Sequence, residues 1–173
     1  MEFNVLTIKL SSDDNGVEGK NMKIETLKDV LSWTQGFHES LSTCMQHCGD
    51  KNVSKRSKLL LDYLAKHETH LADVVEGFSQ QASSNALNTW CYEYLAKHPI
   101  IHKAACQEPF SEINSLEITE VIMEQHRQVI ELYRYLYSRA DSPSAIELLK
   151  QLLDLEEHEV MQMTQSANRL EDL

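Results

Sequence analysis

The stretch that most constrains the fold is residues 59–78, LLLDYLAKHETHLADVVEGF. Its apolar residues recur at steps of three, four or seven, the pattern of a helix that buries one face. They are Leu60, Leu64, Leu71, Val74 and Phe78. One position of this row is polar, because His67 falls on it, with Glu68 and His70 nearby. A fold for this chain must therefore bury a long helix and also accommodate a histidine at or near its buried face.

Similar amphipathic segments recur along the chain and predict an all-α fold. Helices are expected over residues 22–47, 53–81, 116–140 and 143–170. Only five Gly and three Pro occur in 173 residues, which favours long elements over many turns. The short link at 49–52 predicts that the first two helices are antiparallel.

The rest of the chain is expected to connect or precede these helices. Residues 1–20 are interpreted as an N-terminal arm, and residues 21–173 as the helical domain. The long connection at 82–115 contains SNALNTWCYEYLAKHP, which predicts a short helix that ends before Pro99. This connection would carry the chain from one end of the helical domain to the other.

The two predicted helix pairs are similar to each other in sequence. A shift of 88 residues places His38 on His126, and the same shift matches several further positions. Those pairs are Leu41 with Val129, Leu60 with Leu148, Leu61 with Leu149, Leu64 with Leu152, Glu68 with Glu156, and His70 with His158. The repeat predicts a pseudo-twofold axis that brings His38, His70, His126 and His158 to related positions.

Charge and composition argue against several classes of function. The formal net charge of −11, with no offsetting Lys/Arg cluster, disfavours binding to nucleic acid. No apolar run approaches the roughly 20 residues of a membrane span. The N-terminus lacks the pattern of a secretory signal, so a cytoplasmic protein is expected. No nucleophile motif or phosphate-binding loop is present, and no catalytic residue is predicted.

The order of elements leads to a family. Four helices, a long crossover between the second and third, and histidines on the second and fourth resemble the ferritin-like superfamily, which includes the rubrerythrins. More narrowly, LLDYLAKHE followed by LNTW is similar to a group of uncharacterised bacterial ferritin-like proteins. The resemblance implies an up-down four-helix bundle over residues 22–170. It also implies a di-iron site with Glu on two helices and Glu-X-X-His on the other two.

The chain departs from that ligand pattern at the decisive positions. Three residues before His70 stands His67 instead of Glu, and three residues before His158 stands Leu155. Glu68 lies two residues before His70, about 200° around the helix, so the two cannot chelate one ion. The same holds for Glu156 and His158. The usual di-iron site is therefore not supported by the sequence.

A different, histidine-rich metal site remains open. His67 and His70 are three residues apart and could bind one ion together, while Glu156 is in phase with the apolar residues of its helix. The candidate ligands are His38, His67, His70, His126, Glu156 and His158. Imidazole-rich sites suit iron or zinc better than magnesium or calcium.

The alternative is that these histidines are metal-free members of the core. A buried neutral imidazole is commonly hydrogen-bonded to a neighbouring polar group. His67 with Glu156, or His126 with Tyr63 or Tyr133, would satisfy this requirement.

Two hypotheses of function follow. The first is a non-catalytic ferritin-like protein without a cofactor, which acts through its surface by self-association, as a homodimer, or through a protein partner. The second is a metal-binding protein with iron or zinc, either redox-active or metal-storing, that uses the histidine-rich site.

Overall fold

The computed structural model describes residues 24–91 and 110–171, and regular structure in these ranges is helical, without a strand. The four long helices are α1 (Leu27–Lys51), α2 (Lys55–Gln81), α5 (Ser115–Arg139) and α6 (Pro143–Glu171). A short helix, α3 (Ser84–Leu87), follows α2. The predicted all-α class is confirmed. The predicted N-terminal arm, and the later part of the predicted short helix, lie outside the described residues.

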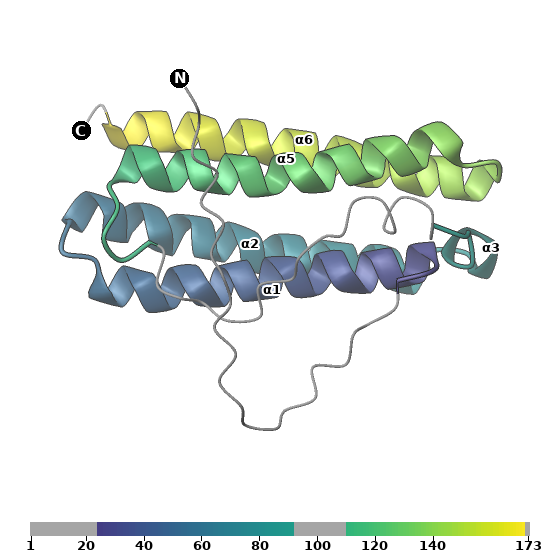
Figure 1. Cartoon of the computed structure of the whole chain (residues 1–173), viewed down its shortest axis with the longest axis horizontal. Coiled ribbons are helices and arrows are strands. Elements are labelled where there is room, and N and C mark those ends of the chain that lie inside the picture. The colour runs from purple at the N-terminus through teal and green to yellow at the C-terminus, as the bar shows by residue number, and fades with distance from the viewer. Residues whose placement is uncertain (1–23, 92–109, 172–173) are drawn as a thin grey trace, which may run out of the picture.

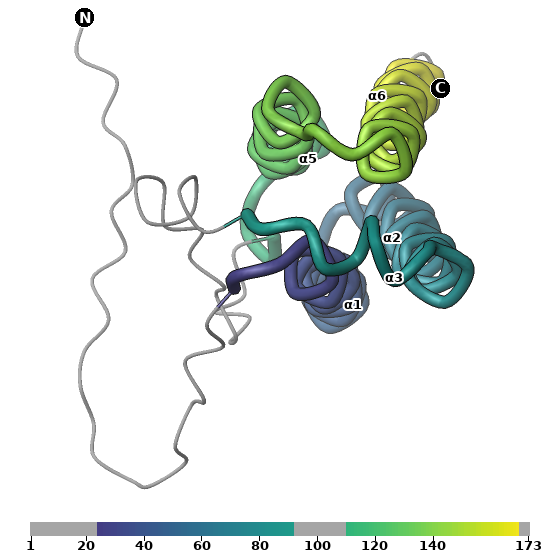
Figure 2. Tube along the Cα trace, turned by 90° about the vertical axis from the view of Figure 1, so that its right-hand side faces the viewer, coloured from purple at the N-terminus to yellow at the C-terminus, as the bar shows by residue number. Residues whose placement is uncertain are grey.

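The long helices are arranged in two layers. Helices α1 and α2 lie side by side in one layer, and α5 and α6 lie side by side in the other (Figures 1 and 2). Helix α2 ends, and α5 begins, at opposite ends of the molecule (Figure 1). The two described ends of the connection therefore lie at opposite ends of the helices, as expected from the sequence.

Capping interactions determine where two of the helices begin. The Thr26 hydroxyl accepts a hydrogen bond from the Asp29 N–H, and the Asp29 carboxylate accepts one from the Thr26 N–H at 2.9 Å. This capping box starts α1 at Leu27, five residues after the predicted start. Asn114 and Glu117 form the same arrangement at the start of α5.

The core contains two groups of buried apolar side chains. The first core cluster includes Leu27, Val30, Leu31, Trp33, Val75, Val129, Leu132, Tyr133, Leu149 and Leu152. The second core cluster includes Met45, Leu60, Leu61, Leu64, Leu71, Ile118, Ile122 and Met163. Along α1, α5 and α6 the two clusters occupy different lengths of the helix, and the residues between them form the candidate site.

Candidate metal centre

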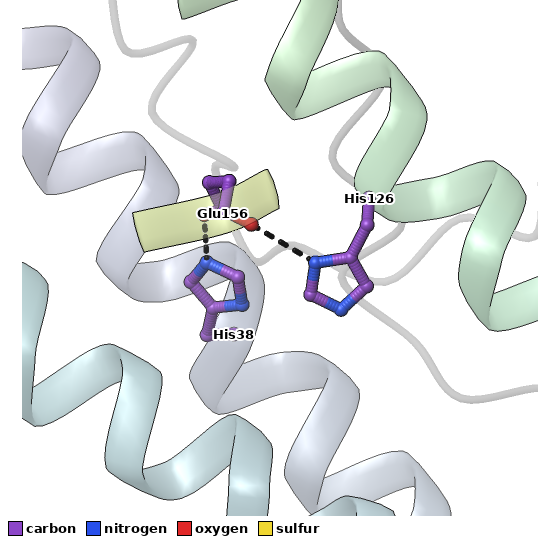
Figure 3. A group of neighbouring side chains, drawn as sticks. All are labelled: His38, His126 and Glu156. Carbon is purple, nitrogen blue, oxygen red and sulfur yellow. Dashed lines mark hydrogen bonds and ion pairs between the residues drawn. The ribbon is translucent and has the colours of Figure 1, made fainter. Parts of the chain in front are cut away.

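Four polar side chains meet between the two core clusters. They are His38 from α1, Glu68 from α2, His126 from α5 and Glu156 from α6, and each is 0% exposed. Figure 3 shows His38, His126 and Glu156 converging from their three helices. We call these four residues the His–Glu ring. Each long helix contributes one member.

Hydrogen bonds close the ring, because each imidazole contacts both carboxylates. His38 lies 2.7 Å from Glu68 Oε2 through Nδ1, and 3.0 Å from Glu156 Oε1 through Nε2. His126 lies 3.0 Å from Glu156 Oε2 through Nδ1, and 2.8 Å from Glu68 Oε1 through Nε2. All four ring nitrogens and all four carboxylate oxygens therefore have a partner within the ring.

The pattern of atoms follows the internal repeat. In each half of the chain, the histidine uses Nδ1 for the glutamate of its own half and Nε2 for the glutamate of the other half. A shift of 88 residues exchanges His38 with His126 and Glu68 with Glu156, and it leaves this scheme unchanged. The predicted pseudo-twofold relation thus applies to individual hydrogen bonds.

Electrostatics make the ring a set of four charges with no net charge. Burial alone would lower the pKa of His38 and His126, but the two carboxylates outweigh it and raise these values to about 9 and about 10. Burial alone would raise the pKa of Glu68 and Glu156, but the two imidazoliums lower each to about 2. Near neutral pH both histidines are cationic, and every ring nitrogen donates a hydrogen bond. The predicted neutral imidazole is therefore replaced by a charged one.

A ring of four buried charges is an energetically costly way to fill a core. Removing four charges from water carries a large desolvation penalty, which the mutual attraction offsets only with full pairing. Replacing buried ion pairs with well-packed apolar residues is often neutral or stabilising. Core packing alone therefore does not explain the ring, and strongly shifted pKa values in a buried cluster are typical of functional sites.

Helical periodicity places these polar residues inside. On α2, Leu61, Glu68 and Val75 follow one another at steps of seven, and each is 0% exposed. On α6, Glu156 lies seven residues after Leu149 and seven before Met163, which are both buried. Glu68 was not among the predicted ligands, although its match to Glu156 in the repeat was the signal that could have identified it.

The remaining predicted ligands lie outside the ring. His67 is 23% exposed and sits between α2 and α6, with Nδ1 3.2 Å from Glu159 Oε2 and its ring 4.4 Å from that of Tyr63. His70 and His158 are exposed, and His158 contacts the Gln162 amide. His67 and His70 therefore do not join the His–Glu ring.

The expected metal-free pairings also differ from those observed. His67 contacts Glu159 instead of Glu156. His126 contacts two carboxylates, whereas the prediction gave it a tyrosine. The general expectation that buried histidines have polar partners is nevertheless confirmed.

Part of the ring has a geometry suited to a metal ion. His38, His126 and Glu156 each offer a donor atom, and these atoms lie within 4.8 Å of one another. Zinc sites place donors about 2.0–2.2 Å from the ion, so donors can lie up to about 4 Å apart. A small contraction of the ring would thus create a three-ligand site. The di-iron set implied by the family resemblance does not fit, because the ring supplies two carboxylates instead of four.

A surface groove lies between α5 and α6, the helices that carry His126 and Glu156. It is lined by Met123, Arg127, Ile130, Val160 and Thr164. Arg127 follows His126 directly on α5, and Val160 lies one turn after Glu156 on α6.

No helix in the described part of the chain is long and apolar enough to cross a membrane. Comparisons of the chain with protein-family models, with curated proteins and with solved structures found no match. Function must therefore be inferred from the residues of the chain itself, and the His–Glu ring is the feature that most requires a functional explanation.

Proposed function

We propose that the chain is a ferritin-like four-helix bundle protein that binds one divalent transition-metal ion through His38, His126 and Glu156. The observation that carries this proposal is the fully buried ring of two imidazoles and two carboxylates, one from each long helix. Bundle cores are a common place for metal sites built from side chains of facing helices.

The donor set indicates which ions would bind. Two imidazoles and one carboxylate form the ligand set of many non-haem Fe(II) sites, and imidazole also suits Zn²⁺. Mg²⁺ and Ca²⁺ prefer oxygen ligands and fit this set poorly. We therefore assign the site to Fe²⁺ or Zn²⁺.

Charge balance supports the same assignment. A metal-binding imidazole is neutral, so a divalent ion takes the place of the two imidazolium protons. The ring then has zero net charge in the protonated state and in the metal-bound state. The core can exchange two protons for one ion without acquiring an uncompensated buried charge.

Glu68 has a distinct role in this arrangement. With the ion on His38 Nε2 and His126 Nδ1, the opposite nitrogens keep their hydrogens and donate to Glu68, as they do in the ring. A carboxylate behind a ligating imidazole fixes its tautomer and its orientation. Glu68 would orient both histidines, while Glu156 would bind the ion directly.

The test is metal uptake by protein prepared without a His tag. Chelator-treated protein is dialysed against Zn²⁺, or against Fe²⁺ without oxygen, and the retained metal is measured by elemental analysis. We expect one ion per chain, loss of that ion in His38→Gln, and full retention in the control His158→Gln, whose histidine is exposed on α6. Wild-type protein that retains no ion, or His38→Gln that retains it fully, would overturn the proposal.

A second candidate function is non-catalytic self-association as a homodimer, with the ring serving only the fold. The observation that favours a purely structural ring is that every polar atom of the ring is already paired without a metal. This candidate predicts that chelator-treated protein takes up no ion and that light scattering gives the mass of two chains.

A further inference from the structure

The two sides of the His–Glu ring differ in polarity. On the side of the first core cluster lie Thr34, four residues before His38, and Tyr133, seven residues after His126. A shift of 88 residues places Thr34 on Ile122 and Met45 on Tyr133. Ile122 and Met45 both belong to the second core cluster. Two buried hydroxyl groups on one side thus correspond to two apolar side chains on the other.

The Tyr133 hydroxyl is the unsatisfied member of this pair. Tyr133 is 0% exposed, and its hydroxyl oxygen has no hydrogen-bond partner among the described residues. Burial raises the pKa of Tyr133 and the nearby Glu156 carboxylate raises it further, while a polar contact with the Thr34 hydroxyl, whose geometry falls short of a hydrogen bond, lowers it. Tyr133 lies two turns after His126 on the same buried face of α5, and side chains on a helix lean toward its N-terminus, so the hydroxyl lies toward the ring.

Packing does not require a hydroxyl at this position. The equivalent Met45 is fully buried and apolar, so a side chain without a donor fills the corresponding space in the other half. Thr34 already donates its own hydrogen to the Val30 carbonyl at 3.1 Å. A buried O–H group without an acceptor costs free energy, and such a group calls for a specific explanation.

We propose that the Tyr133 hydroxyl donates a hydrogen bond to a small exogenous ligand, either water or a small inorganic anion, that binds at the Glu156 side of the ring. This inference rests on the proposed metal site, because two imidazoles and one carboxylate leave coordination positions open to such a ligand. At the two positions that the repeat makes equivalent to Tyr133 and Thr34 stand Met45 and Ile122, whose side chains have no donor. Ligand binding is thereby confined to one side of a nearly symmetric ring.

Azide binding to cobalt-loaded protein tests this inference. Co²⁺ replaces the native ion and gives a visible spectrum, which is titrated with sodium azide for wild type, Tyr133→Phe and the control Met45→Leu. We expect azide to bind about tenfold more weakly to Tyr133→Phe, since a hydrogen bond to a charged partner is lost. Met45→Leu should bind azide like wild type. Cobalt stoichiometry is measured for each protein.

The outcomes separate the two proposals. Failure of wild-type protein to take up cobalt would overturn the metal site, and this inference with it. Normal cobalt uptake with the same azide affinity in wild type and Tyr133→Phe, or with no azide binding, would overturn this inference alone. A purely structural Tyr133 would alter the unfolding transition and leave azide affinity unchanged, so both are measured on the same samples.

Discussion

The two helix pairs follow one sequence repeat but pack differently. Helices α1 and α2 pack more closely against each other than α5 and α6 do. Small side chains explain this difference in the first pair. Ser42 donates to the Ala65 carbonyl at 2.8 Å, and Gly49 lies against the Leu61 side chain, where an added Cβ would be 3.5 Å away.

At the equivalent positions the second pair has larger residues. Ser42 corresponds to Ile130, and Gly49 corresponds to Tyr137, which is partly exposed. Ile130 also lines the groove between α5 and α6. The two halves thus differ in their packing and in their hydroxyl groups, and they share the ring. The requirement common to both halves is one histidine and one glutamate at fixed positions.

The largest effect should come from removing one ring carboxylate from the metal-free protein. Glu68→Gln and Glu156→Gln should each lower the free energy of unfolding by about 3–5 kcal/mol, because both buried imidazoliums lose one of their two charged partners. Equivalent positions should give similar losses in urea denaturation followed by circular dichroism. A control is Glu157→Gln, which breaks the exposed contact with Arg134.

Replacing the whole ring would sharpen this result. If four leucines at the ring positions restore the stability of wild type or exceed it, then the ring is maintained at the expense of stability. A loss below about 1 kcal/mol in the single variants, the size typical of exposed pairs, would contradict a charged ring.

Metal affinity should differ between the Glu68 and Glu156 variants, although their losses of stability are similar. Glu156→Gln removes a ligand and should abolish uptake of Zn²⁺, whereas Glu68→Gln should weaken it about 10–100-fold, the usual effect of losing an orienting partner. Competition with a chromophoric chelator gives both affinities. Equal losses in the two variants would show that both carboxylates bind the ion directly.

The dependence of stability on pH should show the titration of both ring histidines. Their pKa values in the fold lie above the ordinary value of 6.5, at about 9 and about 10, so the stabilisation is fully present below pH 6.5. It should fall as pH rises toward 9–10, by up to about 1.4 kcal/mol per pH unit for each histidine. His126→Gln should halve this slope in metal-free protein, and an unchanged slope would contradict the charge assignment.

The glutamates should also make stability depend on pH, but in the acidic range and in the opposite direction. Their pKa values are lowered from 4.5 to about 2, so their stabilisation is present above pH 4.5 and is lost as pH falls toward 2. Urea denaturation at a series of pH values between 2 and 5 measures this acidic part of the pH dependence. Stability that stays constant over this range would contradict it.

The smallest expected change in stability comes from the side of the ring that carries Thr34 and Tyr133. Tyr133→Phe should raise the free energy of unfolding of metal-free protein by about 1 kcal/mol, because it removes a buried donor that has no acceptor. Met45→Leu, the matched change in the other half, should lower stability by less than about 1.5 kcal/mol. Thermal unfolding of the two variants beside wild type measures both, and a destabilised Tyr133→Phe would point to a structural hydrogen bond.

The sequence predicted the helices and the repeat well, because both rest on periodicity over many residues. It misplaced one face of α2. Counting in sevens from Leu60 led to His67 and Val74, which are both partly exposed. The adjacent row of Leu61, Glu68 and Val75 is fully buried.

A single residue turns a helix by about 100°, so this small error exchanged Glu68 for His67 in the predicted site. His38, His126 and Glu156 were predicted because they were judged to fall at or near apolar seams of their helices. The contacts across the ring could not be predicted, because they depend on how α1 and α2 sit against α5 and α6. Sequence spacing does not determine that placement.

The two hydrogen bonds made by Nε2 atoms have a mechanical consequence. They join α1 to α6 and α5 to α2, and so they tie one layer of the molecule to the other. The closest approach of helices lies within each layer, and the helices of different layers approach each other less closely. A shift of one layer by a single helical turn, about 5.4 Å, would break both ties and leave each histidine with only the glutamate of its own layer. The ring therefore specifies the register of the two layers relative to each other.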